Sequence, residues 1–308
     1  MIDIVVTNPS DLEFDVFVGC VGYEDRSISA LKKVNESGFS GSSHLLDYNS
    51  GDTFSYQSNL AHPLVENAKK HSTTSELLQS ILHTLKTNGS ANIAFDVTSL
   101  DRSKIAEIIQ FFFRNYQYIE NICILYFPIG FTKPNHSLDV VRSFGPVIPG
   151  FIGDTSYSRD ELTLVIGAGY EYGKAVGAIE LLEPDRVYCL KPIGTDKRFE
   201  EEVLKNNLEF SFLENPDLLI DYDLQNPANL FYEVRRTVEF ELAERNVLIL
   251  PMGPKIFAAI SMIVASILHP SVMVWRHSTV SVDAPKSVSN AFSCGIDIRF
   301  SFRFVALS

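Results

Sequence analysis

Two short segments in the first half of the sequence combine glycine, hydroxyl and charged side chains directly after apolar runs. The first runs from Gly19 to Ser27, and the second runs from Asp96 to Lys104. Glycines allow backbone N–H groups to approach a ligand closely, and an arginine can hold a phosphate or a carboxylate through two hydrogen bonds. The two segments therefore predict the binding of an anionic ligand, such as a molecule that carries phosphate.

The first segment offers a candidate for each part of a nucleotide. Tyr23 can stack on a base, and Glu24 can accept a hydrogen bond from ribose or act in glycosidic or phosphodiester cleavage. Arg26 can hold a phosphate. In the structural alternative, Glu24 and Asp25 balance the positive start of a helix, and Arg26 only forms an ion pair. The ligand contacts predicted from this segment are Gly19, Gly22, Tyr23, Glu24 and Arg26.

The second segment is the most polar turn that follows an apolar run in this sequence. Its hydroxyls lie near the expected start of a helix, where free N–H groups and the helix dipole favour an anion, and Arg102 and Lys104 add positive charge. Asp96 can orient the loop or accept a hydrogen bond from ribose. The structural alternative is that Asp101 caps the helix. The ligand contacts predicted from this segment are Asp96, Thr98, Ser99 and Arg102.

The spacing of Asp96, Thr98 and Arg102 resembles the nucleotide-binding motif after the fourth strand of CARF domains, which sense cyclic oligoadenylates. The segment from Gly19 to Arg26 resembles the motif after their first strand. A tandem pair of such units is similar to a SAVED domain. The resemblance implies a sensor of a nucleotide second messenger in prokaryotic antiviral defence. Because no effector domain is recognisable on the chain, it also implies a partner effector protein.

Two further turns in the second half carry the counterpart of this pattern. A GxGxxxG segment follows an apolar run, and its predicted ligand contacts are Gly167, Gly169, Tyr170, Glu171 and Lys174. Such a turn suits a dinucleotide, and Lys191 after the next strand would suit the extra phosphate of NADP. A glycine turn needed only for close helix packing is the alternative.

The last of these turns contains Gly253 and Lys255, and it stands where the Asp/Thr/Arg motif would recur. A lysine beside a helix start is unfavourable unless an anion is bound there, so both residues are predicted ligand contacts. A solvated lysine at a domain edge is the alternative. The different residues in this turn put symmetric binding of a cyclic ligand in doubt.

Apolar runs of four to eight residues alternate with segments of helical periodicity, which predicts an α/β protein with mainly parallel sheets. The expected strands cover 16–20, 93–95, 122–127, 162–166, 186–190 and 247–250, and the clearest helices cover 27–34, 74–85 and 103–116. The segments that begin at Val18 and Val165 share a strand, a glycine turn and Gly-Tyr-Glu. They predict an internal duplication of a Rossmann-like unit. A linker rich in proline and glycine over 146–158 predicts domains at 1–150 and 151–308.

The composition of the 308 residues, with a net charge of −12, is that of a folded protein that does not bind nucleic acid broadly. A start without a signal peptide predicts a cytoplasmic protein, and four separated cysteines predict reduced, buried thiols.

The apolar stretch 256–275 is interrupted by His269 and Pro270, so a buried helix and strand are expected, with no membrane span. The helix over 227–245, with its many charges, is expected to be a solvated face.

Several function classes lose support because their motifs are missing. The sequence has no P-loop, no HExxH and no metal-spaced set of cysteine and histidine, so no obligatory cofactor or metal is expected. Three readings stay open. They are a nucleotide sensor that acts through a partner, an enzyme that processes nucleotides or uses NADP, and a scaffold subunit of a defence complex that is not catalytic.

Overall fold

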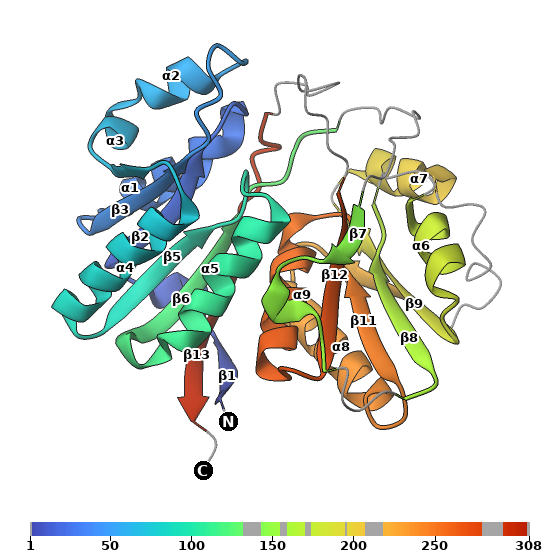
Figure 1. Ribbon diagram of the computed structural model, residues 1–308. Helices are drawn as coiled ribbons and strands as arrows, with labels where there is room; N and C mark the ends of the chain where they lie inside the picture. The colour runs from blue at the N-terminus through green and yellow to red at the C-terminus, as the bar shows by residue number, and fades with distance from the viewer. Residues whose placement is uncertain are drawn as a thin grey trace. The chain divides into compact units, whose positions relative to one another are not determined.

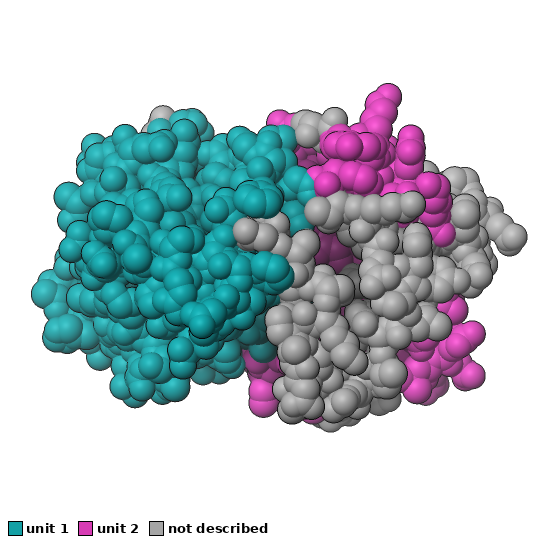
Figure 2. All heavy atoms as spheres, turned by 90° about the horizontal axis from the view of Figure 1, so that it is seen from above, with its two compact units in different colours: residues 1–130, 288–308 teal, residues 131–287 magenta. Residues whose placement is uncertain are grey.

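Two separate sheets organise the chain. A computed structural model describes residues 2–131, 143–154, 159–169, 174–194, 196–206, 218–278 and 292–306. Unit 1 comprises residues 1–130 and 288–308, and unit 2 comprises residues 131–287; Figure 2 colours them separately. Each unit has a mainly parallel sheet with helices on both faces, as Figure 1 shows. The predicted α/β class is confirmed.

The sheet of unit 1 has the order β1-β13-β6-β5-β2-β3-β4. The five strands from β6 to β4 pair in parallel, whereas β13 pairs antiparallel with both β6 and β1. The first parallel strand along the chain, β2, lies between β3 and β5, so the strand order reverses between β2 and β5. The strands are β1 (Ile2–Thr7), β2 (Val16–Val21), β3 (Ser42–Asp47), β4 (Lys69–His71), β5 (Ala91–Asp96), β6 (Ile119–Tyr126) and β13 (Ile298–Ala306).

Capping residues help to determine where the helices of unit 1 begin. Thr73 caps α4 by accepting a hydrogen bond from Glu76 N at 3.2 Å, and the Glu76 carboxylate accepts one from Ser72 N at 3.0 Å. This arrangement resembles a capping box, shifted by one residue on the side of the glutamate. The helices are α1 (Ser29–Glu36), α2 (Tyr56–Leu60), α3 (Pro63–Glu66), α4 (Thr74–Asn88) and α5 (Arg102–Arg114), with short 3-10 turns η1 (Pro9–Asp11), η2 (Asp25–Ile28) and η3 (Tyr116–Tyr118).

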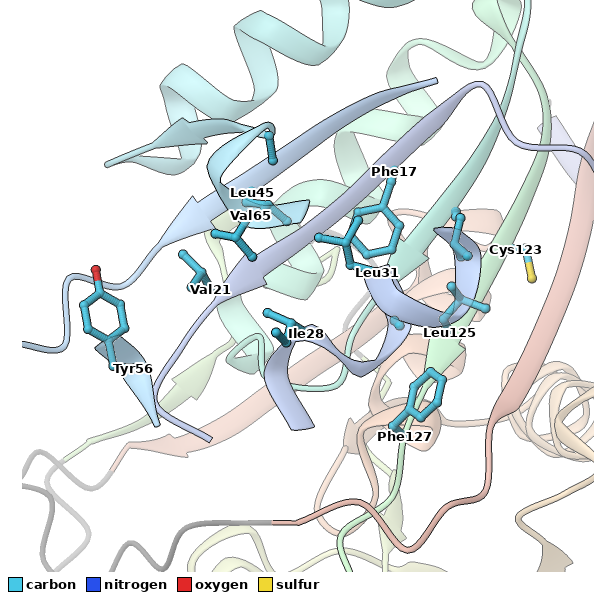
Figure 3. Packing of buried hydrophobic residues seen from close by; sticks show 14 residues of the cluster. Phe17, Val21, Ile28, Leu31, Leu45, Tyr56, Val65, Cys123, Leu125 and Phe127 are labelled. Atoms are coloured by element: carbon cyan, nitrogen blue, oxygen red, sulfur yellow. The ribbon is translucent and has the colours of Figure 1, made fainter. Parts of the chain in front are cut away.

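Apolar side chains of α1, α2 and α3 pack against one face of this sheet, and Figure 3 shows the cluster. Phe17 and Val21 from β2 meet Leu31 from α1, and Val65 from α3 belongs to the same cluster. Alternate residues of a strand point to opposite faces, so Val16, Val18 and Cys20 of β2 face the other layer. Helices α4 and α5 cover that layer (Figure 1). The central strands, buried on both faces, are held rigidly and fix the positions of the turns that leave them.

Unit 2 repeats this plan. Its sheet has the order β10-β9-β8-β11-β12-β7, in which the first five strands pair in parallel and β7 is antiparallel. The strands are β7 (Ser143–Pro146), β8 (Leu162–Gly167), β9 (Arg186–Ile193), β10 (Leu219–Asp223), β11 (Asn246–Leu250) and β12 (Val272–Ser278). The helices are η4 (Pro149–Phe151), α6 (Lys174–Leu182), α7 (Lys197–Asn206), α8 (Pro227–Glu241) and α9 (Lys255–Ile267).

Both units thus place their parallel strands in the order third, second, first, fourth, fifth, with an antiparallel strand beside the fifth. This is the order of the first five strands of the Rossmann fold. The repeated topology agrees with the predicted duplication, and it puts the strand-order reversal of unit 2 between β8 and β11.

The division of the chain differs from the predicted boundary at residue 150. Pro146 of β7 pairs with Trp275 of β12, and the Phe151 side chain is buried at 1% exposure, so the expected linker belongs to unit 2 in its described part. The last strand, β13, returns to unit 1 and lies between β1 and β6. Its buried residues Ile298, Phe300 and Phe302 alternate along the strand, and both of its hydrogen-bonding edges are occupied within the sheet.

The apolar stretch 256–275 and the four cysteines can also be compared with their predictions. No helix among the described residues is both long enough and apolar enough to span a membrane, and the stretch 256–275 forms most of α9 and the start of β12. Cys20, Cys123 and Cys189 are buried, and burial raises the pKa of the Cys123 thiol to about 12. Cys294 is exposed, contrary to the prediction, because it lies in the loop before β13.

Candidate functional site

The two turns nominated from the first half lie at one place in unit 1. One follows β2 and the other follows β5, and these neighbouring parallel strands flank the reversal of strand order. In open α/β sheets, ligands bind beyond the carboxyl ends of the strands at such a switch point. We call this region, comprising the turns after β2, β3 and β5, the carboxyl edge of unit 1.

Glu24 connects the two turns. Its Oε2 atom accepts hydrogen bonds from Arg26 Nε at 3.1 Å and from Ser99 Oγ at 3.0 Å. Arg26 also donates through Nη1 to the carbonyl oxygen of Phe127, just after β6, at 2.7 Å. The side chains of Arg26 and Glu24 are 7% and 18% exposed. Glu24, Arg26 and Ser99, which were predicted as ligand contacts from two separate turns, are therefore in contact in the structure.

Arg26 acts mainly as a structural cation. Burial alone would lower the pKa of its guanidinium, but the charge of Glu24 and the contact with Tyr126 raise it above the ordinary value. Because Nε and Nη1 already donate to protein atoms, the structural alternative describes Arg26 better than a phosphate clamp does. Arg26 connects the turn after β2 directly to the residue after β6, and through Glu24 it supports the contact with the turn after β5.

Asp96 and Thr98 form the bend after β5. Thr98 N donates to Asp96 Oδ1 at 2.9 Å, and Thr98 Oγ1 accepts from Phe127 N at 3.0 Å. Their exposed fractions are 1% and 0%. These buried side chains therefore stabilise the backbone of the turn from its inner side and are not exposed to a ligand. Of the residues that carry the family resemblance in this turn, Arg102 is the half-buried one that reaches the surface.

The start of α5 is capped by Asp101, as the structural alternative for the second turn expected. Asp101 Oδ1 accepts from Lys104 N at 3.0 Å, and Tyr48 Oη donates to Asp101 Oδ2 at 3.3 Å. Burial alone would raise the pKa of the Asp101 carboxyl, but hydrogen bonds from Ser103 and Lys104 N outweigh it and lower that pKa. The cap leaves Arg102 as the first residue of α5.

Sequence reasoning missed the contribution of the loop after β3. Asp47, the last residue of β3, accepts hydrogen bonds from Tyr56 Oη at 2.5 Å and Asn49 N at 2.8 Å, both on Oδ1. Its Oδ2 atom makes no hydrogen bond to any residue that the structure describes. An acid at the end of the second parallel strand is the position from which Rossmann proteins bind ribose hydroxyls. The signal in the sequence was a short polar run, Ser42–Asp47, with two leucines near its end.

The loop after β3 is tied to the turn after β2. Asn59 Nδ2 donates to the carbonyl oxygens of Gly22 at 3.0 Å and Glu24 at 2.8 Å. A Cβ added at Gly22 would have its nearest neighbours at 3.8 to 3.9 Å, so the turn has ordinary space there. Gly19 is different, because a Cβ on it would lie 2.9 Å from the Phe17 ring, and close packing in the strand explains this glycine.

The corresponding switch point of unit 2 is packed differently. A Cβ at Gly167 would lie 2.4 Å from the Phe257 ring and 2.5 Å from the carbonyl oxygen of Met252. Gly253 has a φ of +72°, and a Cβ there would lie 2.3 Å from the carbonyl oxygen of Ala168. Both glycines are therefore explained by close packing of the turn after β8 against the turn after β11.

The structure gives less detail for the other residues of unit 2 that were predicted to contact a ligand. Gly169 lies just past β8, and Lys255 is the half-buried first residue of α9. Tyr170 and Glu171 fall outside the described residues, as does the side chain of Lys174.

Lys191, the proposed NADP phosphate contact, lies inside β9 and pairs with Asp221 of β10 at 3.1 Å. The reason to expect an NADP phosphate at that position is therefore lost.

Glu241 on α8 corrects a further expectation. The charged helix was expected to be a solvated face, but the Glu241 side chain is 0% exposed. Its carboxylate accepts from Thr163 Oγ1 at 2.7 Å and Tyr188 Oη at 2.8 Å, and it pairs with two arginines, Arg186 at 2.7 Å and Arg245 at 3.3 Å. These partners come from the amino-terminal parts of β8 and β9 and from the residues after α8, so the network lies at the amino edge of the sheet.

The comparisons add no family to this description. No protein-family model matches the chain, and no curated protein matches it. Among the described residues, no group of three or more histidine, cysteine, aspartate or glutamate side chains is arranged to hold a metal ion. The geometry of the two switch points is therefore the basis for a functional proposal.

Proposed function

We propose that the protein binds a nucleotide at the carboxyl edge of unit 1 and that the nucleotide-bound form acts on a partner protein. The observation that carries the proposal is the hydrogen bond from Ser99 to Glu24, which joins the turns after β5 and β2 at the switch point. A Rossmann-like strand order places ligands at this position. The ligand class that the family resemblance favours is a cyclic oligonucleotide of antiviral signalling.

The surface groups at this edge suit the parts of a nucleotide. Arg102 and Lys104 lie in the first turn of α5, where their charge would attract a phosphate. Asp47 offers a carboxylate oxygen for ribose hydroxyls from the end of β3. These groups come from two different loops that Tyr48 holds together through its hydrogen bonds with Asp101.

Binding without chemistry fits Glu24 and Asp101 better than cleavage does. A catalytic base or nucleophile needs an oxygen directed at the reacting atom. Glu24 uses Oε2 to hold both Arg26 and Ser99, and Asp101 uses both oxygens for capping and for Tyr48. These two acids maintain the loops, which favours a sensor over a nucleotide-cleaving enzyme.

A thermal-shift panel tests the proposal, with NADP, NAD, ATP, ADP-ribose and cyclic oligonucleotides as probes. Each mixture is then analysed by chromatography of the recovered ligand. A ligand at 100 times its Kd stabilises the folded protein by about 2.7 kcal/mol, so the expected result is a rise of several degrees in Tm with a cyclic oligonucleotide that is recovered intact.

Three other outcomes of the panel would oppose the proposal, each in a specific way. Consumption of the nucleotide would make the protein an enzyme. Stabilisation by NADP alone would favour an oxidoreductase. Stabilisation by none of the probes would contradict nucleotide binding and favour a scaffold role.

A further inference from the structure

The loop between β3 and α2 contains an aromatic side chain that packing does not explain. Phe54 is 50% exposed, although it lies beside the carboxyl edge of unit 1. Its φ is 42°, in the left-handed region that non-glycine residues adopt at a cost. Asn49 and Gly51 in the same loop also have positive φ, at 46° and 60°. The loop therefore keeps Phe54 in an unfavourable backbone conformation, with its ring half exposed to solvent.

The loop is fixed at several points. Ser55 N donates to the carbonyl oxygen of Tyr23 at 3.0 Å, Gln57 Nε2 donates to that of Gly51 at 2.7 Å, and Tyr56 N donates to that of Thr53 at 3.0 Å. The first of these bonds attaches the loop directly to the turn after β2. Phe54 is thus held at the carboxyl edge by its two flanking segments.

The Phe54 ring rests against Tyr23. The ring centroids are 6.2 Å apart, and the planes are inclined at 49°. Tyr23 is half-buried, and its backbone is part of the turn that Asn59 and Ser27 stabilise. A ring that is supported on one side and exposed on the other provides a flat apolar surface for a planar group, and aromatic side chains use such surfaces to stack on nucleobases.

From these observations we infer that Phe54, supported by Tyr23, stacks on the base of the bound nucleotide and gives the site its preference for ligands that carry an aromatic base. This inference rests on the proposed function and adds the group that recognises the base. Asp47, the last residue of β3, begins the same turn seven residues before Phe54, and its carboxylate is our candidate for the ribose hydroxyls. In this arrangement the end of β3 and the loop that follows it would hold the sugar and the base, and the start of α5 would hold the phosphate.

Calorimetric titrations with adenosine 5′-monophosphate and ribose 5-phosphate test the inference, because the two probes differ only in the base. Wild-type protein should bind the nucleotide at least about tenfold more tightly than the sugar phosphate, since base stacking on an aromatic ring has this magnitude. Phe54→Gly should abolish most of this preference while leaving the Kd for ribose 5-phosphate unchanged. Phe54→Trp should retain it.

The variants are chosen so that folding does not confuse the result. Glycine is the residue best suited to a positive φ, so Phe54→Gly should have a Tm no lower than that of the wild type. Tyr232→Ala is the matched control, because Tyr232 is an aromatic residue of unit 2 that is 55% exposed. It should leave both Kd values unchanged.

Equal binding of the two probes by wild-type protein would overturn the inference, and so would an unchanged preference in Phe54→Gly. If cyclic oligonucleotides still raise the Tm in the panel described above, only the assignment of Phe54 falls. If no probe binds in either experiment, the proposed function falls together with it.

Discussion

The two units share a strand order but place their polar networks at opposite edges of the sheet. In unit 1, Glu24, Arg26 and Ser99 join the loops at the carboxyl edge. In unit 2, the described turns at that edge pack closely on one another through Gly167 and Gly253, and the buried carboxylate of Glu241 lies at the amino edge. The same topology can therefore support either a polar loop cluster or a packed joint at its switch point.

This difference has a physical cause in the residues that follow the fourth parallel strand of each unit. In unit 1, the Asp96 side chain and the Thr98 hydroxyl accept hydrogen bonds from backbone N–H groups, so the turn is built from polar side chains. In unit 2, the turn after β11 contains the buried Met252 and begins an almost fully buried helix. An apolar turn of that kind gains stability by packing, and it gives a phosphate little to bind.

The largest loss of unfolding free energy is expected when the buried carboxylate of unit 2 is removed. This carboxylate has a structural role at the amino edge of its sheet, in contrast with those at the carboxyl edge of unit 1. Glu241→Ala leaves two arginines beside an empty position, and breaking a buried ion pair typically destabilises a protein by about 3–5 kcal/mol. Urea unfolding measures this loss. Glu239→Ala on the same helix, at an ion pair whose glutamate is 44% exposed, should cost less than about 1 kcal/mol. Nucleotide binding by folded Glu241→Ala should match that of the wild type.

The contribution of Glu241 should also depend on pH. Burial alone would raise the pKa of its carboxyl, but hydrogen bonds from a threonine, a tyrosine and an arginine lower it below the ordinary value. A lowered pKa in the folded state means that the stabilisation is complete above the unfolded pKa, about 4.3, and is lost as the pH falls through the folded value. The difference between wild type and Glu241→Ala should therefore narrow in acid. A constant difference down to pH 2 would contradict this role.

A pair of glycine variants tests whether the two switch points differ in packing. Gly253→Ala forces a Cβ to 2.3 Å from a carbonyl oxygen at a φ of +72°, and a loss of at least about 2 kcal/mol in unfolding free energy is expected. Gly22→Ala meets its nearest atom at 3.8 Å, so its loss should be below about 1 kcal/mol. Equal losses in the two variants, measured by urea unfolding, would remove the contrast between the units.

Much of the fold could be predicted from the sequence, because buried parallel strands are continuous apolar runs. The runs at β2, β5, β8 and β11 identified the strands that flank both switch points. The strands β3, β4 and β10 were missed because polar residues make up most of β3 and all of β4 and interrupt the apolar residues of β10. The place of β13 could not be predicted, since alternation along a strand gives its buried face and not the strands with which it pairs.

The candidate site could be located but not fully assigned from the sequence. Glycine and polar residues after buried strands predicted a site at the carboxyl edge, and the structure brings the two turns of unit 1 into contact there. Whether Arg26 faces a ligand or the Phe127 carbonyl depends on a contact 101 positions away in the sequence, which local patterns do not contain. Glu241 looked like a solvated charge for the same reason, because its partners come from β8 and β9.

Titration of the ligand that raises the Tm most, into wild type, Arg102→Ala and Lys255→Ala, tests the central claim most directly. The two variants remove the cation at the first position of α5 and of α9, at corresponding places in the two units. We expect one ligand per chain, a Kd at least about tenfold weaker in Arg102→Ala because a charge-assisted hydrogen bond is lost, and an unchanged Kd in Lys255→Ala. A loss of binding in Lys255→Ala with full binding in Arg102→Ala would contradict the assignment of the site to unit 1.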